Sequence, residues 1–169
     1  ATVHEAALLG ADAIAIGLSL CGPGEPDEIQ RAARMVQAAE AIGMPTVAHS
    51  YPCGSYLKDT EQAVRDLIAW ARKEKLPIAL RLVKGAYWDA ETVFAKQCDW
   101  PVPVWTHKPE SDLAHEKISR LILENHDIVY FACASHNVRS IAAVMEYARQ
   151  LDVPEGRYEF QVLYGMAEP

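Results

Sequence analysis

The sequence repeats one pattern along its length, a short apolar run followed by an amphipathic helical stretch. The apolar runs start about 30 to 50 residues apart, the size of a strand–helix–strand unit. They predict strands at Asp12–Leu20, Thr46–Tyr51, Ile78–Val83, Ile128–Ser135 and Tyr158–Leu163. Helical periodicity predicts helices at Asp27–Ile42, Thr60–Lys75, Ala90–Gln97, Asp112–Glu124 and Val138–Leu151. This alternation is typical of a parallel α/β fold.

The length of the chain limits which parallel fold it can complete. A closed (β/α)8 barrel has eight strands and about 250 residues, whereas this chain has 169 residues. We therefore expect a single α/β domain over residues 1–169, built from the βα units of a partial TIM-type barrel. An open five-stranded sheet, a dimer that pairs exposed edges and a piece of a longer chain all remain open. Because uncovered sheet edges promote association, we expect a homo-oligomer or a partner chain over them.

Composition excludes several classes of function. The net charge of −7 argues against binding to nucleic acid or to an anionic membrane surface. No apolar run reaches the roughly 18 residues of a membrane span, and the chain does not start like a signal peptide. The four cysteines lack metal-ligand spacing, so no metal site is predicted. Cys21 and Cys133 are expected to be buried free thiols, and a cytoplasmic location is expected.

The most informative segment begins in the third predicted strand and extends beyond its end. It contains Arg81, Lys84, Gly85, Tyr87 and Trp88. Buried cations are costly without anionic partners, so their position at the end of a strand indicates a site. A glycine lets a ligand approach the backbone, and two aromatic rings can flank a flat ligand.

Strand alternation separates the members of this segment. Arg81 and Val83 fall on one face, whereas Lys84 shares the face of Leu80 and Leu82. We therefore expect Lys84 to form a helix-side salt bridge or to be solvated, rather than to act as a Schiff-base lysine.

The same alternation predicts which later residues accompany Arg81. His136 follows the fourth strand and Gln161 lies on the fifth, both on the faces expected to be interior. We expect them to converge with Arg81 near the carboxyl ends of the strands, where parallel folds bind ligands. Two structural alternatives remain open. Arg81 can pair internally with Glu159, and Asn137 can cap the next helix. The other histidines are expected at the surface or in loops, namely His4, His49, His107, His115 and His126.

Three motifs in order resemble the proline dehydrogenase family, most closely the barrel domain of bifunctional proline-utilisation flavoenzymes. They are Arg81–Trp88, Ser135–Asn137 and Tyr158–Pro169, and the resemblance runs from about Tyr56 to Pro169. It implies a distorted (β/α)8 barrel that binds FAD. It also implies a small imino acid as substrate, since the family oxidises L-proline to pyrroline-5-carboxylate by hydride transfer to the flavin.

The resemblance assigns roles to individual residues. Arg81 would be the catalytic candidate beside the reactive nitrogen of the flavin, and Tyr87 and Leu163 would border the proline pocket. The cofactor-binding candidates are Arg81, Val83, Gly85, Trp88, Thr106, Lys108, His136, Asn137 and Gln161. Strands that supply other active-site residues of the family are missing from this sequence, so we expect the chain alone to be incomplete and inactive.

Residues 1–54 show a different resemblance. The stretch from Gly43 to Pro52 and the N-terminal residues 1–13 resemble the archaeal-type class I fructose-bisphosphate aldolase family, including Ser50-Tyr51-Pro52 after a strand. A junction near Cys53–Tyr56 would make the chain an engineered or recombined chimera of two barrel fragments, without catalytic activity of its own. A Schiff-base aldolase is a third hypothesis.

Overall fold

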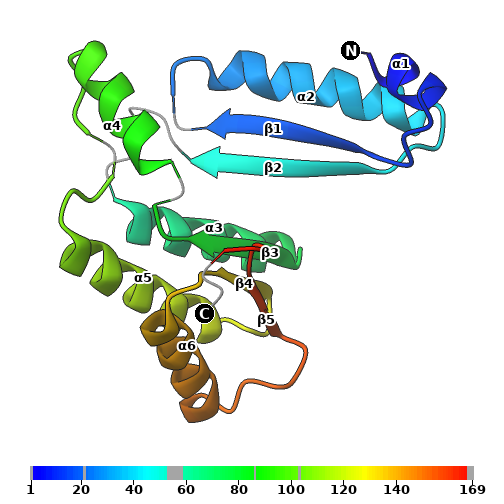
Figure 1. Cartoon of the computed structure of the whole chain (residues 1–169). Helices are drawn as coiled ribbons and strands as arrows, with labels where there is room; N and C mark the ends of the chain where they lie inside the picture. Colours follow the sequence, from blue (N-terminus) through cyan, green and yellow to red (C-terminus); the bar gives the residue numbers. More distant parts are fainter. Residues whose placement is uncertain (1, 21, 53–58, 86, 103, 167–169) are drawn as a thin grey trace. The chain divides into compact units, whose positions relative to one another are not determined.

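The structure is a computed structural model that describes residues 2–20, 22–52, 59–85, 87–102 and 104–166. The chain divides into two compact units, residues 1–58 and residues 59–169 (Figure 1). Within the described ranges, no helix is both long enough and apolar enough to cross a bilayer.

The described part of the first unit consists of two helix–strand pairs. Its helices are α1 (Val3–Leu8) and α2 (Glu25–Glu40), and its strands are β1 (Ile14–Leu20) and β2 (Thr46–Pro52). The strands pair in parallel, and α2 packs against β1 (Figure 1). Thr2 and Glu5 form a reciprocal capping box at the start of α1, as their spacing predicts. The first unit thus has the parallel α/β arrangement expected from the sequence.

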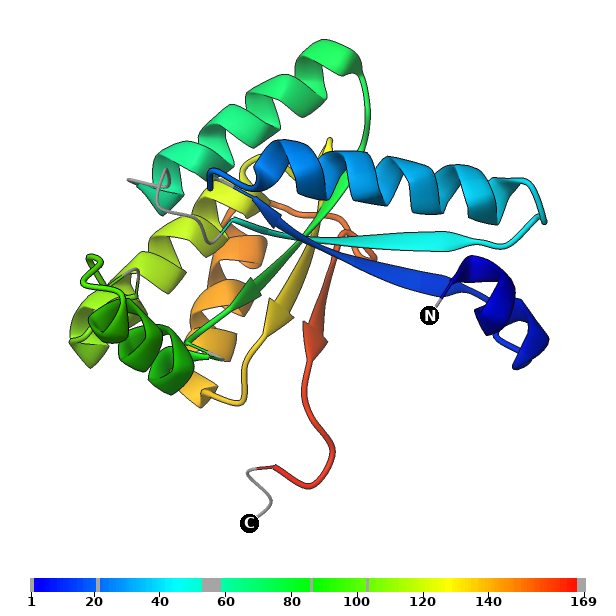
Figure 2. The same ribbon diagram turned by 90° about the horizontal axis from the view of Figure 1, so that it is seen from above.

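The described part of the second unit contains the three remaining strands and four helices. In chain order these are α3 (Thr60–Glu74), β3 (Ile78–Val83), α4 (Trp88–Gln97), α5 (Lys108–Leu123), β4 (Val129–Ala134), α6 (Val138–Gln150) and β5 (Tyr158–Gln161). The strands form a parallel sheet in the order β3–β4–β5. Figure 2 shows α5 and α6 on one side of these strands.

The core of the second unit lies between the sheet and its helices. Phe131 and Cys133 of β4 are buried there against Ile68 of α3, Ile122 of α5 and Val144 of α6. Burial of these side chains supplies most of the driving force that fixes the layer. The Cys133 thiol is therefore buried as predicted, whereas Cys21 lies outside the described residues.

The structure confirms an α/β fold with parallel, unclosed sheets. The described strands fall into two sheets, so they do not form the open five-stranded sheet that was one alternative. Helix α5 begins at Lys108 instead of Asp112, because Pro109 suits the first turn of a helix. The last strand ends at Gln161 instead of Leu163. This leaves Leu163 in the segment beyond the sheet.

Candidate functional site

A row of hydrogen-bonded side chains crosses the face of the β3–β4–β5 sheet opposite the core. Arg81 Nε donates to Gln161 Oε1 at 2.6 Å, and Gln161 Nε2 donates to Glu159 Oε1 at 2.5 Å. Tyr130 donates its hydroxyl proton to Glu159 Oε2 at 2.8 Å. All four side chains alternate with the residues that face the helices, so each strand contributes to the row.

The row orients the Arg81 guanidinium and leaves part of its hydrogen-bonding capacity free. Only Nε is bonded to Gln161, and the two terminal nitrogens have no hydrogen-bond partner among the described residues. The alternative expected from the sequence was an ion pair between Arg81 and Glu159. No such ion pair is present among the described residues. Glu159 instead accepts hydrogen bonds from Gln161 and Tyr130, and these lower the pKa of its carboxyl. Arg81 therefore retains donors for an external acceptor.

Small side chains lie beside the row. Ala134 sits between Val83 and Gln161 in the register of the sheet, and Ala132 sits between Arg81 and Glu159. Both side chains end at Cβ, so they add little bulk above the backbone of β4, and both are buried between the neighbouring strands. On this face, polar side chains of β3 and β5 therefore flank small side chains on the central strand β4.

His136 and Asn137 lie in the connection between β4 and α6. His136 Nε2 accepts a hydrogen bond from the backbone N–H of Leu163 at 3.0 Å. Nε2 is therefore unprotonated, and the neutral ring carries its proton on Nδ1. Asn137 caps α6 by accepting from the N–H of Ser140 at 3.1 Å. The predicted capping role is confirmed.

Lys84 is separated from Arg81 as the alternation predicts. Its side chain is 14% exposed, and Nζ donates to Asp112 Oδ1 on α5 at 2.7 Å and to Ser140 Oγ on α6 at 2.5 Å. Asp112 also accepts from Lys108 Nζ at 2.8 Å. Hydrogen bonds from Lys108 and Lys84 lower the pKa of Asp112 to about 2. The expected helix-side salt bridge is thus present.

The remaining site candidates lie around α4 and the start of α5. Trp88 Nε1 donates to the carbonyl of Trp105 at 3.0 Å, which ties the start of α4 to the segment before α5. Tyr87 is 68% exposed, and Thr106 is also exposed. No hydrogen bond among the described residues joins Trp88, Thr106 or Lys108 to the Arg81 row. The structure therefore brings together only part of the candidate set.

One histidine differs from its expected location. His115 is 4% exposed within α5, so its assignment to the surface or a loop was wrong. Burial, and then the charge of Lys84, lower its pKa to about 4. The sequence contained a signal for this burial, because His115 precedes Ile118 by three residues and so shares the apolar face of the helix.

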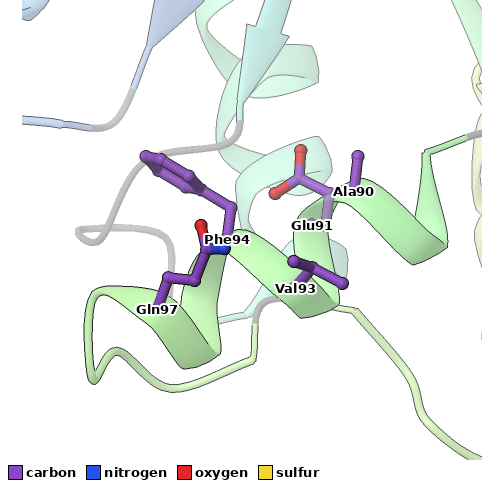
Figure 3. Close-up of a pocket in the computed structure, with 5 residues that line it drawn as sticks. All are labelled: Ala90, Glu91, Val93, Phe94 and Gln97. Carbon is purple, nitrogen blue, oxygen red and sulfur yellow. The ribbon is translucent and has the colours of Figure 1, made fainter.

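A surface hollow of about 440 Å³ lies on α4, and none of the predicted site residues lines it. Figure 3 shows its lining of Ala90, Glu91, Val93, Phe94 and Gln97. Because no charged or polar group of the Arg81 row reaches it, this hollow is separate from the candidate site.

Comparisons with known proteins agree on one family. A family model described as proline dehydrogenase matches residues 27–169. The chain is 35% identical over 116 residues to the bifunctional protein PutA of Escherichia coli, which is 68% of this chain and 9% of that protein. It is 33% identical over 112 residues to proline dehydrogenase 2 of Bacillus subtilis, covering 66% of this chain and 31% of that protein. The chain therefore spans only a small part of these relatives.

Solved structures of similar fold cover more of the chain than the sequence relatives do. The structure of proline utilization A from Bdellovibrio bacteriovorus, inactivated by N-propargylglycine, aligns with a TM-score of 0.68 at 38% identity. That alignment covers 93% of this chain and 16% of the other. The family match begins at Asp27, upstream of the junction expected near Cys53–Tyr56, which itself lies outside the described residues. Neither finding supports an aldolase-like origin for residues 1–54.

Proposed function

Because the chain belongs to the proline dehydrogenase family, we propose that it forms one wall of a flavin site in an enzyme that oxidises L-proline. The observation that supports this most is the Arg81–Gln161 hydrogen bond on the open face of the β3–β4–β5 sheet. This hydrogen bond holds a guanidinium with free donors beside the small side chains of β4. Such a surface suits the flat, electron-accepting ring of FAD.

The donor set fits this cofactor. The terminal nitrogens of Arg81 lack partners among the described residues, and the tautomer of His136 leaves Nδ1–H free to donate. The residues that would hold FAD are Arg81, Val83, Gly85, Trp88, Thr106, Lys108, His136, Asn137 and Gln161. When bound, FAD supplies the acceptor for the hydride that leaves L-proline.

Individual residues of this chain have distinct tasks in the proposed reaction. Arg81 holds positive charge where negative charge develops, and Gln161 keeps its guanidinium oriented. Tyr87 and Leu163 border the imino acid. Groups from outside this stretch complete the pocket, because the chain covers only 9% of its Escherichia coli relative.

We further propose that residues 1–169 form one α/β domain of a single family. The chimera hypothesis is not favoured, because the proline dehydrogenase match already starts at Asp27. A homo-oligomer or partner chain at the sheet edges and a cytoplasmic location remain predictions.

The visible spectrum of the purified protein, with the groups that complete the pocket present, tests the function. We expect flavin absorbance after incubation with FAD, and loss of that absorbance when L-proline is added without oxygen. Binding without a response to proline would contradict proline oxidation. A chain that leaves the fluorescence of added FAD unchanged would contradict the flavin site itself.

A further inference from the structure

One largely buried ammonium joins the end of β3 to two helices of the second unit, α5 and α6. Lys84 follows β3 directly, and its Nζ reaches Asp112 on α5 and Ser140 on α6. The side chains of Lys84 and Asp112 are 14% and 15% exposed, and Ser140 is fully buried. A cation in such surroundings costs free energy unless its donors are satisfied. These two hydrogen bonds therefore fix where the ammonium lies.

The chemistry of the ammonium sets the direction of the next hydrogen bond. An ammonium can only donate, so Ser140 Oγ accepts from Lys84. The hydroxyl proton of Ser140 is then directed to Asn137 Oδ1, at 3.3 Å. The backbone N–H of Ser140 donates to the same atom at 3.1 Å. Two donors meet one atom of the Asn137 amide, so that atom must be the oxygen.

This direction determines what the Asn137 side chain offers on its other side. With Oδ1 occupied by Ser140, the amide nitrogen keeps two N–H donors, and they have no partner among the described residues. The neighbouring His136 also has a free donor at Nδ1, because Nε2 accepts from Leu163. The unpartnered side-chain groups of His136 and Asn137 are therefore both donors.

We propose that Lys84 is a positioning residue that acts through Ser140 to hold the Asn137 amide with its N–H groups toward an acceptor oxygen of the bound cofactor. The identity of that cofactor rests on the proposed function. Lys84 does not touch the ligand, since it lies on the helix side of β3, opposite Arg81. Substitution of Lys84 lets the Ser140 hydroxyl turn to another acceptor. The Asn137 amide is then held only by the capping hydrogen bond from the backbone N–H of Ser140.

The composition of the chain allows a direct test without any cofactor. The sequence contains two asparagines, Asn125 and Asn137, so labelling with 15N-asparagine gives two side-chain amide groups in an NMR spectrum. Asn125 is an internal reference, because its Nδ2 donates to the Leu121 carbonyl at 2.8 Å, independently of Lys84.

In Lys84→Met, we expect the Asn137 side-chain resonances to shift and the Asn125 resonances to stay in place. Ser140→Ala should change Asn137 similarly, and combining the two substitutions should add little, because both break one chain of hydrogen bonds. Lys84→Arg, which keeps a cationic donor, should recover much of the original spectrum. Unchanged Asn137 resonances in Lys84→Met would overturn the proposal, whether or not the protein binds FAD.

Cofactor affinity tests the second half of the proposal. We expect FAD to bind about tenfold more weakly to Lys84→Met and to Ser140→Ala, the effect of one misplaced hydrogen bond. Arg139→Met is the matched control, because it removes an ion pair between α6 and Glu116 of α5 without touching the Ser140 chain. Wild-type affinity in Lys84→Met would refute the link to the ligand. Absence of FAD binding by the wild type would instead refute the proposed function, and the Asn137 resonances would still decide the role of Lys84.

Discussion

Arg81 Nε and Gln161 Oε1 lie 2.6 Å apart, although the two residues are 80 positions apart in the chain. The contact spans β3 and β5, which do not pair with each other but both flank β4. Gln161 is oriented in turn by Glu159, which accepts from its amide nitrogen. The guanidinium thus has one fixed edge and one free edge. A catalytic cation needs this combination, because its charge must be directed before the reaction begins.

The first prediction concerns Arg81. In the protein with its completed pocket, Arg81→Met should lower kcat for proline oxidation by about 10² to 10³, because the charge that stabilises the developing anion is lost. Arg81→Lys should recover only part of this loss, since the donors of an ammonium sit on a single atom. Lysine therefore cannot reproduce the planar guanidinium, which bonds Gln161 through Nε and presents two further nitrogens at its other edge. Steady-state kinetics with L-proline measure both effects.

Arg149→Met is the control for this comparison, because Arg149 is exposed on α6 and, within the described part of the chain, its hydrogen bonds and ion pair go to Glu146. An Arg81→Met enzyme with the kcat of the wild type would remove Arg81 from the catalytic role.

The sequence predicted the site best where a single strand decides the geometry. Alternation within β3 was enough to place Arg81 on one face and Lys84 on the other, because a strand allows only two directions for its side chains. The partner of Lys84 was harder to predict. The helical pattern marked Asp112 only as the first residue of a helix, and nothing in the sequence singled out Ser140.

Contacts between distant elements were predicted least well. The identity of the Arg81 partner depended on whether residue 159 or residue 161 of β5 came within reach, and sequence spacing gave both the same face. The burial of His115 depended on which side of α5 met the sheet. Such choices are made by packing between helices and strands, whereas local propensity leaves them open.

The second prediction concerns the backbone at Gly85. Its φ is +68°, a left-handed conformation that L residues with a Cβ avoid. A Cβ there would meet nothing closer than Trp88 Cβ at 3.9 Å, so space is available and the strain lies in the backbone. Gly85→Ala should therefore lower the free energy of unfolding by about 1 to 2 kcal/mol.

Urea unfolding measures this loss, and Gly85→Asn should recover part of it, because asparagine tolerates left-handed backbone better than alanine does. Gly24→Ala is the control, since the φ of Gly24 is −84° and its added Cβ would meet nothing within 4 Å. An equal loss in both alanine variants would argue against backbone strain at Gly85.

The third prediction concerns two thiols of the second unit. Cys133 is fully buried in β4, and burial raises its pKa, so little thiolate is present in the folded protein. Cys98 is partly exposed after α4. A thiol reagent should label Cys98 in the native protein and label Cys133 only after denaturant is added. Mass spectrometry of tryptic peptides separates the two sites, and equal native labelling would contradict the buried position of Cys133.

The fourth prediction concerns the acid stability of the second unit. His115 faces Lys84, Asp112 and Glu116, and its pKa falls from 6.5 to about 4 because of burial and the charge of Lys84. Between these values the unfolded chain binds a proton that the folded chain does not, so stability is lost as the pH falls through this window. The pKa difference corresponds to about 3 kcal/mol.

His115→Leu should therefore flatten the decline in the free energy of unfolding between about pH 6.5 and pH 4, measured by urea titration at a series of pH values. The Asp112 carboxyl contributes below this window, because its pKa moves from 3.8 to about 2 and its contribution is lost only as the pH falls through that lower range. Ile122→Val is the control, since it destabilises the same helix by about 1 kcal/mol without removing a titratable group. If Ile122→Val keeps the wild-type slope and His115→Leu keeps it too, the acid sensitivity arises elsewhere.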